Sequence, residues 1–349
     1  MTSEIHIRRE GAAGRITLDR PNALNALTYA MCGQIETALD AWEHDTSVKH
    51  IMIDAVGEKA FCAGGDIQDL YAAGKEGDFA FGQRFWADEY RLNARLAEYP
   101  KPVISFLQGF TMGGGVGIGC HGSHRIVDAG SQIAMPECSI GLVPDVGGSL
   151  ILARAPGRLG AYLGLTTARM KGADAIYAGF ADFLIPQEAW PTLKDALIAG
   201  EDAGSLAQNA VHTGETTLPA LQDCIDAHFG GETLGDILHA LNTSVDTEFA
   251  ASALKMIARN SPLAMACAVE MIARLRAPDA DIRTALAMEY RFTFRALEHS
   301  DFIEGVRAQV IDKDRTPCWK HNLDDVPEEA CAQMLASLGA DELSFEKKG

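Results

Sequence analysis

Two acidic residues, Glu137 and Asp145, lie in the stretch "AMPECSIGLVPDVGG" (134–148), where prolines, glycines and apolar residues surround them. Ionised carboxylates rarely occupy such surroundings unless they are paired, hydrogen-bonded or functional. Burial raises the pKa of a carboxyl group toward the neutral range, where it can exchange protons with a substrate. Because Gly141 and Pro144 can bend the chain between them, we predict that the two carboxyl groups face one cavity and divide acid and base roles.

A structural role for the pair is open at this stage. Asp145 would then cap the helix that begins in "VGGSLILA", and Glu137 would pair with a basic residue. Spacing alone does not choose between the two interpretations.

Two glycine-rich loops precede the acids, "KAFCAGGDI" (59–67) and "GFTMGGGVGIGCHG" (109–122), and each follows an apolar stretch that reads as a strand. Glycine lets the backbone approach a ligand closely and present its N–H groups. The second loop opens a glycine-rich helix, whose N-terminus adds a partial positive charge. The loops could therefore supply two N–H donors to one oxyanion. The alternative is that they are tight turns and sites of close packing.

The combination of two such loops and a buried acid pair predicts a site for attack on, or enolisation of, a carbonyl group. Removing one donor from an oxyanion hole typically raises the barrier by about 2.7–4 kcal/mol. An acyl thioester is a good candidate substrate for this arrangement.

The elements that must position these residues alternate between strands and helices. The stretch "EIHIRREGAAGRITLDRP" predicts a β-hairpin, and Thr28 is a candidate N-cap for the helix that follows. Short apolar runs at 50–56 and 102–107, and then "HRIVDA" and "SQIAMPE", predict buried strands, with helices following in 147–178. This alternation indicates an α/β fold.

The pattern changes near residue 190. We predict a mixed core over residues 1–190 and a mostly helical C-terminal region over residues 191–349. Within that region, Pro262 interrupts the helical periodicity.

The overall composition excludes several classes of function. The chain has 349 residues and a formal net charge of −18, so nucleic acid is not expected as a partner. Its eight cysteines show no CxxC spacing, which argues against a zinc site or a disulfide framework. The opening residues lack the apolar core of a secretory signal, and no apolar run is long enough for a membrane span. We therefore expect a soluble intracellular protein with no bound metal.

The motifs "PNALNAL", "KAFCAGGDI", "GFTMGGGVGIG" and "MPECSIGLVPDVGG" resemble successive signatures of the crotonase superfamily, also called the enoyl-CoA hydratase/isomerase family. The resemblance implies a crotonase-like spiral of ββα units that binds acyl-CoA thioesters and needs no separate cofactor. It implies that the N–H groups of Gly65 and Gly114 hold the thioester oxygen. Gly64, Asp66 and Gly113, beside them in the same loops, are then predicted to contact substrate.

Gly117 separates this chain from the hydratases of that family, which the resemblance expects to carry their first catalytic glutamate at this position. Glycine there, with Glu137 and Asp145 retained, resembles the 3-hydroxyisobutyryl-CoA hydrolase subfamily, which acts in valine breakdown. The stretch "EYRLN" (89–93) and the late stretch 288–320 are similar to that subfamily, which places Glu89 near the acyl group.

The expected reaction is hydrolysis of a short-chain 3-hydroxyacyl-CoA to the free acid and CoA, with Glu137 and Asp145 catalytic. An enoyl-CoA hydratase or isomerase is the alternative, and a non-catalytic CoA-binding relative is a third. The sequence does not identify the acyl group or the residues that bind the CoA phosphates. We expect an acyl-CoA partner, a bacterial cytoplasmic or processed mitochondrial location, and possible assembly into a homo-oligomer.

Overall fold

The N-terminal hairpin begins a six-stranded sheet in the computed structural model, which describes residues 4–211 and 214–346. The first two strands are antiparallel, as predicted, and the remaining neighbours are parallel. In spatial order the strands are β1 (Ile5–Glu10), β2 (Ala13–Leu18), β3 (His50–Ala55), β5 (Val103–Phe106), β7 (His124–Val127) and β10 (Phe183–Leu184).

A second sheet takes the strands that the first one skips. Its order is β4 (Ala60–Cys62), β6 (Phe110–Met112), β8 (Gln132–Ala134) and β9 (Met170–Lys171). The first three are parallel, and β9 is antiparallel to β8. The pairs β3–β4, β5–β6 and β7–β8 thus each give one strand to each sheet, and a helix follows each pair. This is the spiral of ββα units that the sequence predicts.

The chain divides into two compact units, each assembled from three segments. The first unit comprises Met1–Asp66, Leu92–Ala134 and Arg169–Leu218, and the strands named above lie in it. The second comprises Ile67–Arg91, Met135–Ala168 and Pro219–Gly349. The predicted division at residue 190 follows the order of elements along the chain and stays a prediction.

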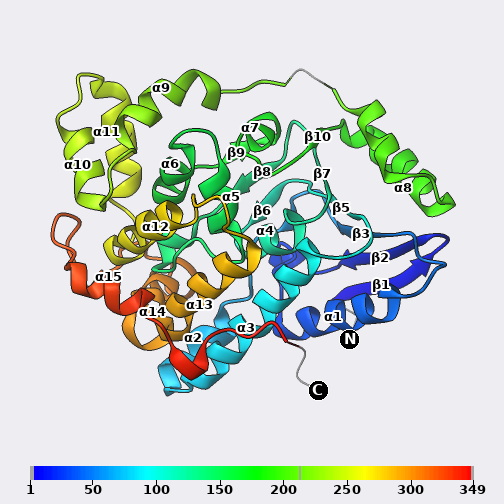
Figure 1. Ribbon diagram of the computed structural model, residues 1–349, viewed down its shortest axis with the longest axis horizontal. Coiled ribbons are helices and arrows are strands. Elements are labelled where there is room, and N and C mark those ends of the chain that lie inside the picture. Colours follow the sequence, from blue (N-terminus) through cyan, green and yellow to red (C-terminus); the bar gives the residue numbers. More distant parts are fainter. Residues whose placement is uncertain (1–3, 212–213, 347–349) are drawn as a thin grey trace. The chain divides into compact units, whose positions relative to one another are not determined.

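Two helices cover opposite faces of the six-stranded sheet in the first unit (Figure 1). Ala13 and Gly14 are neighbours on β2 and therefore point to opposite faces. Ala13 belongs to a buried cluster with Leu193 and Leu197, whereas a side chain at Gly14 would collide with the ring of Trp42. Leu193 and Leu197 lie on one helix and Trp42 on the other, namely α8 (Trp190–Ala199) and α1 (Tyr29–Glu43).

The N-terminus of α1 is capped as expected, because the Thr28 hydroxyl accepts a hydrogen bond from the N–H of Met31. The first unit also contains the end of α3 (Phe79–Ala97), α4 (Gly114–Gly119), α7 (Gly172–Tyr177) and the 3-10 helices η1 (Pro21–Ala23), η3 (Gln187–Ala189) and η4 (Ala203–Asn209). The helix α7 packs against β8, β9 and β10.

The second unit is helical. It contains α2 (Gln68–Glu76), most of α3, η2 (Glu137–Ile140), α5 (Gly148–Arg154), α6 (Leu159–Thr166), α9 (Leu218–His228), α10 (Leu234–Asn242), α11 (Thr247–Ile257), α12 (Pro262–Arg274), α13 (Ile282–His299), α14 (Phe302–Val306), the π-helix η5 (Arg307–Ile311), α15 (Glu328–Leu335) and η6 (Gly339–Asp341).

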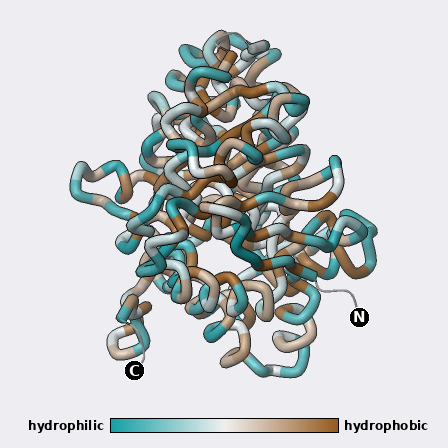
Figure 2. Tube along the Cα trace, turned by 90° about the vertical axis from the view of Figure 1, so that its right-hand side faces the viewer, coloured by the Kyte–Doolittle hydropathy of each residue, from teal (hydrophilic) through white to brown (hydrophobic). Residues whose placement is uncertain are grey.

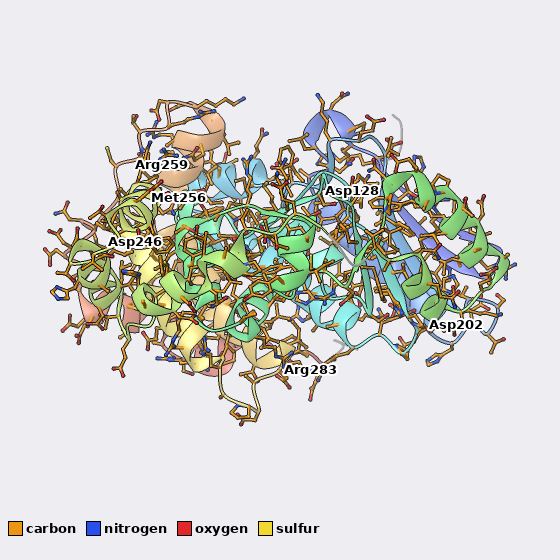
Figure 3. The ribbon with its side chains drawn as sticks, turned by 90° about the horizontal axis from the view of Figure 1, so that it is seen from above. Asp128, Asp202, Asp246, Met256, Arg259 and Arg283 are labelled. Atoms are coloured by element: carbon orange, nitrogen blue, oxygen red, sulfur yellow. The ribbon has the colours of Figure 1, made fainter. Side chains whose placement is uncertain are left out.

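The central helix of the second unit is α12, which contacts α5, α6, α10 and α15. Pro262 does interrupt the periodicity, because it begins α12, and Ser261 caps that helix. Asp246, labelled in Figure 3, caps α11 by accepting the N–H of Phe249 at 3.1 Å. Figure 2 shows hydrophilic residues mainly on outward loops and hydrophobic stretches inside. No helix among the described residues is long and apolar enough to span a membrane.

Candidate active site

Four carboxyl groups are buried in the second unit, each at most 4% exposed: Glu89 of α3, Glu137 of η2, Asp145 before α5, and Glu289 of α13. Moving even one carboxylate out of water is costly. A group of four acids therefore points to a role in chemistry, provided that hydrogen bonds or shared protons stabilise them.

Asp145 is held by a tyrosine. The Tyr90 hydroxyl donates to Oδ2 of Asp145 at 2.7 Å. Burial raises the pKa of Asp145 to about 7, against the opposing effect of the Tyr90 hydrogen bond. Asp145 can therefore take up or release a proton near neutral pH.

Glu137 lies at the start of η2, three residues after β8, rather than at the end of a strand as the sequence suggested. Its Oε2 is buried and has no hydrogen-bond partner among the described residues. Burial raises the pKa of Glu137 well above its usual value, and the neighbouring charges of Asp145, Glu289 and Glu89 act in the same direction. A carboxyl group in this state is a strong base once it has lost its proton.

Glu89 is also unsatisfied, because its Oε1 is buried without a partner among the described residues. Burial and the charge of Asp145 raise the pKa of Glu89 to about 8. Its carboxyl group is therefore largely protonated at pH 7 and can donate a hydrogen bond.

The structural interpretation of the acid pair is wrong on both counts. The N-cap of α5 is Gly147, and Asp145 makes no capping hydrogen bond. No ion pair between Glu137 and a basic residue is found within the described part of the chain. Asp145 therefore does not cap the helix, and its buried partner is the Tyr90 hydroxyl, whereas Glu137 has no basic partner that would account for its burial.

The first glycine loop leaves β4 in the first unit. Leu27 forms a parallel β-bridge with Gly65. The Leu27 N–H donates to the Gly64 carbonyl oxygen at 2.9 Å, and the Leu27 carbonyl oxygen accepts the N–H of Asp66 at 2.8 Å. In a parallel bridge of this kind, the N–H of the central residue points away from the partner strand. Accordingly, the Gly65 N–H has no acceptor among the described residues.

The second glycine loop leaves β6, the parallel neighbour of β4. Gly114 is the first residue of α4, so its N–H has no acceptor within the helix. A Cβ on Gly115 would lie 2.1 Å from the Cys62 carbonyl oxygen, which shows how closely α4 approaches the end of β4. The structure thus brings the Gly65 and Gly114 loops to the same edge of one sheet.

The other residues predicted to contact substrate, Gly64, Asp66 and Gly113, lie in the same two glycine loops. Gly64 and Gly113 adopt positive φ angles of 122° and 51°, which glycine accommodates without strain. The Asp66 carboxylate forms an ion pair with Arg20 at 3.0 Å, so its side chain is already engaged. Contact of these residues with substrate stays a prediction.

Tyr90 and Glu289 lie among the buried acids, but the sequence patterns did not predict either of them as a site residue. Both lie in stretches that carry the family resemblance, but nothing in their spacing shows what they contact. One signal was available for Glu289: it shares the buried face of α13 with Ala285, Leu286 and Phe292. An acid on the apolar face of an amphipathic helix is a candidate for function.

Residues 13–335 match the enoyl-CoA hydratase/isomerase family. The chain belongs to that family. With the two sheets of ββα units described above, this match confirms the crotonase-like fold predicted from the sequence. No group of three or more histidine, cysteine or acidic residues suited to a metal ion is found in the described ranges.

Relatives within the enoyl-CoA hydratase/isomerase family cover nearly the whole chain. The protein named 3-hydroxyisobutyryl-CoA hydrolase, mitochondrial, of Rattus norvegicus is 39% identical over 99% of this chain and 91% of its own length. The protein of the same name from Homo sapiens is 37% identical over 98% and 91%.

Solved structures agree on the fold and carry other names. A structure described as an enoyl-CoA hydratase from Rhodobacter sphaeroides is 55% identical, with a TM-score of 0.94 over 98% of this chain and 100% of that chain. One described as a carnitinyl-CoA dehydratase from Mycobacterium thermoresistibile is 38% identical, with a TM-score of 0.93 over 99% and 100%. These names make it necessary to decide between hydration and hydrolysis on chemical grounds.

Proposed function

We propose that this protein hydrolyses a short-chain 3-hydroxyacyl-CoA thioester, with 3-hydroxyisobutyryl-CoA as the preferred substrate, to the free acid and CoA. The observation that carries the proposal is the buried acid pair Glu137 and Asp145, which has no basic partner within the described residues. The names of the relatives that cover nearly the whole chain support the same reaction, which belongs to valine breakdown.

The thioester carbonyl oxygen accepts hydrogen bonds from the N–H groups of Gly65 and Gly114 in the proposed mechanism. Neither N–H has an acceptor among the described residues. Backbone donors that are already oriented stabilise the developing oxyanion without reorganisation. The chain order supports this role, because Gly65 and Gly114 each follow, within three residues, the second strand of a ββα unit.

Glu137 supplies the attacking group, and it follows the second strand of the third unit. As a general base it takes a proton from water, which adds to the thioester carbon. As a nucleophile it attacks that carbon itself and forms an anhydride that water then hydrolyses. Both routes need an ionised Glu137, so kcat/KM should rise with pH toward its raised pKa.

Asp145 orients the 3-hydroxyacyl group or the water and assists the departure of CoA. Burial raises the pKa of both acids, so near neutral pH Glu137 and Asp145 together still hold a proton, and that proton can pass to the leaving thiolate. Two acids in unlike surroundings can thus divide the roles of base and acid.

Hydration of an enoyl-CoA is the second candidate, favoured by the name of the Rhodobacter sphaeroides structure. Adding water across a C=C bond requires a base for the water and an acid for the carbon. Position 117, where the resemblance expects the first hydratase glutamate, is a glycine buried within α4. A hydratase with this site would lack one of its two groups, which is why we favour hydrolysis.

The deciding experiment measures CoA release with a thiol reagent for 3-hydroxyisobutyryl-CoA, 3-hydroxypropionyl-CoA and acetyl-CoA, and the loss of enoyl absorbance for crotonyl-CoA. We expect fast CoA release from the 3-hydroxyacyl thioesters and little hydration. Rapid hydration with no release of CoA would establish the second candidate instead.

The Glu137→Gln variant tests the assignment of the attacking group. We expect the kcat for CoA release to fall by about 100-fold or more, because one essential acid–base group typically contributes about 10²–10⁴-fold. An unchanged kcat would remove Glu137 from the mechanism.

The remaining parts of the proposal concern the surroundings of the enzyme. The reaction needs no cofactor, since CoA belongs to substrate and product. We place the protein in a bacterial cytoplasm or, as a processed form, in the mitochondrial matrix, the second in keeping with the names of its relatives. Assembly into a homo-oligomer stays a prediction.

A further inference from the structure

The turn that carries Asp145 is held in an unfavourable backbone conformation. The N–H of Gly148 donates to the Asp145 carbonyl oxygen at 2.7 Å, and the two residues between them, Val146 and Gly147, have φ angles of 54° and 78°. A left-handed conformation costs a β-branched residue roughly 1–2 kcal/mol. Contacts from elsewhere in the second unit must therefore stabilise this turn.

Glu289 provides those contacts from α13. Its Oε2 accepts the N–H of Gly147 at 2.8 Å, and its Oε1 accepts the N–H of Ser149 at 3.3 Å and the Ser149 hydroxyl. Because the N-cap Gly147 has no side chain, this carboxylate performs the capping of α5 that an N-cap side chain would otherwise perform.

The second anchor of the turn is Tyr90, which binds the Asp145 carboxylate itself. The two anchors belong to packed helices, since the rings of Tyr90 on α3 and Tyr290 on α13 lie edge to face at 6.3 Å. The backbone after Asp145 is thus fixed by one helix and its side chain by the other.

We propose that Glu289 is a positioning residue for the acid Asp145: it clamps the Asp145–Ser149 turn through its hydrogen bonds to Gly147 and Ser149. The inference rests on the proposed thioester hydrolysis and adds a residue to it. Glu289 does not touch the substrate in this scheme.

The charge of Glu289 predicts a shift in the pH profile that the loss of a purely structural contact would not cause. The titratable groups around Glu137 are Glu89, Asp145, Glu289 and the Cys138 thiol. Burial and the charge of Asp145 raise the pKa of Glu289 itself to about 8, so its charge acts on Glu137 mainly at alkaline pH. There the ionised Glu289 helps to raise the pKa of Glu137, and removing that charge should lower the pKa. The rise of kcat/KM with pH should then move to lower pH.

The test compares Glu289→Gln and Glu289→Asp with the unmodified enzyme in CoA release from 3-hydroxyisobutyryl-CoA between pH 5.5 and 9.5. For Glu289→Gln we expect kcat to fall about 10- to 100-fold, the loss typical of a small displacement of a catalytic group, with KM changed by less than about threefold. The midpoint of the pH profile should also move to lower pH. Glu289→Asp keeps the charge, so its midpoint should stay with that of the unmodified enzyme although its kcat falls.

Asp174→Asn is a matched control in the first unit. The buried Asp174 carboxylate accepts the N–H and hydroxyl of Thr217 and the N–H of Leu218, so it holds the last residues of the first unit with the same kinds of donor. We expect Asp174→Asn to lower the thermal midpoint while kcat and the pH profile stay unchanged.

A Glu289→Gln enzyme with normal kcat, or with a lowered kcat and an unmoved pH profile, would overturn the proposal. If that variant does not fold, Ser149→Ala decides, because it removes one donor and retains the carboxylate. It should lower kcat more than KM, and normal kcat in that variant would also overturn the proposal. An unmodified enzyme that releases no CoA would instead refute the underlying hydrolysis.

Discussion

The Tyr90 hydroxyl binds a single oxygen of the Asp145 carboxylate. This hydrogen bond opposes the effect of burial on the pKa of Asp145. Burial raises the pKa of Tyr90 itself, so the hydroxyl keeps its proton and remains a donor. A neutral phenol beside a carboxylate can orient that carboxylate without adding charge.

Tyr90→Phe should therefore lower kcat by about tenfold and raise the pKa of Asp145 above about 7. The pH profile of CoA release should move to higher pH, opposite to the shift expected for Glu289→Gln. Tyr290→Phe is the matched control, because its hydroxyl donates to the Gln83 carbonyl oxygen at 3.2 Å rather than to an acid. Equal pH shifts in both variants would contradict this role for Tyr90.

Glu89 is expected to reduce stability at alkaline pH. Burial and Asp145 raise the pKa of Glu89 from its usual 4.5 to about 8, so between these values the unfolded chain loses a proton that the folded chain keeps. Stability from this group is complete below pH 4.5 and falls as pH rises. Glu89→Gln should raise the free energy of unfolding by about 2–4 kcal/mol at pH 8.5 and change it little at pH 5.

The measurement is urea unfolding at the two pH values. A Glu89→Gln variant that gains the same stability at pH 5 as at pH 8.5 would show that the effect is packing rather than ionisation. Loss of activity in the same variant would indicate that the acid is retained for function at a cost in stability.

At the scale of elements, the close contact between α4 and β4 places the N–H groups of Gly65 and Gly114 at the same edge of the four-stranded sheet. A Cβ on Gly115 would lie 2.1 Å from the carbonyl oxygen of Cys62, which is backbone and cannot rotate away. Gly115→Ala should therefore displace α4, lower stability by about 1–3 kcal/mol and reduce kcat for CoA release.

Gly33→Ala is the control for that substitution. Gly33 lies within α1, and a Cβ there would meet nothing within 4 Å. Alanine should stabilise the helix by about 0.5–1 kcal/mol and leave kcat unchanged. Thermal unfolding and CoA release measured on both variants check the pair; a stable, fully active Gly115→Ala enzyme would contradict the close approach.

At the scale of the whole molecule, the two units should respond to pH in opposite ways. In the first unit, burial works against ionisation of Asp54, but Lys194, Arg15 and Thr17 hold its pKa below the usual value. Stability from Asp54 is present above pH 3.8 and is lost as pH falls through its lowered pKa. The second unit holds carboxyl groups with raised pKa values, and its stability falls as pH rises from about 5 to 8.

Hydrogen exchange followed by peptide mass analysis should resolve the difference. After correction for the intrinsic dependence of exchange on pH, we expect segments of the second unit around α5 and α13 to lose protection first between pH 6 and 9. Strands of the first unit around Asp54 should lose protection first below pH 4. Simultaneous loss in both units at both extremes would contradict separate electrostatic control.

Local patterns in the sequence determined much of this protein. Alternation and turn residues predicted the hairpin of β1 and β2, and Thr28 predicted the start of α1, because these signals act over a few neighbouring residues. Glycine spacing located both loops, and two acids in apolar surroundings marked Glu137 and Asp145 as unusual.

The tertiary structure alone decided what those residues contact. Glu289 is separated from Gly147 by 142 positions, and Tyr90 from Asp145 by 55, so no local pattern could connect them. The pKa values of the acids likewise depend on burial and on charges brought together by folding. Sequence spacing describes geometry only along one element, whereas a catalytic group depends on the neighbours that packing places around it.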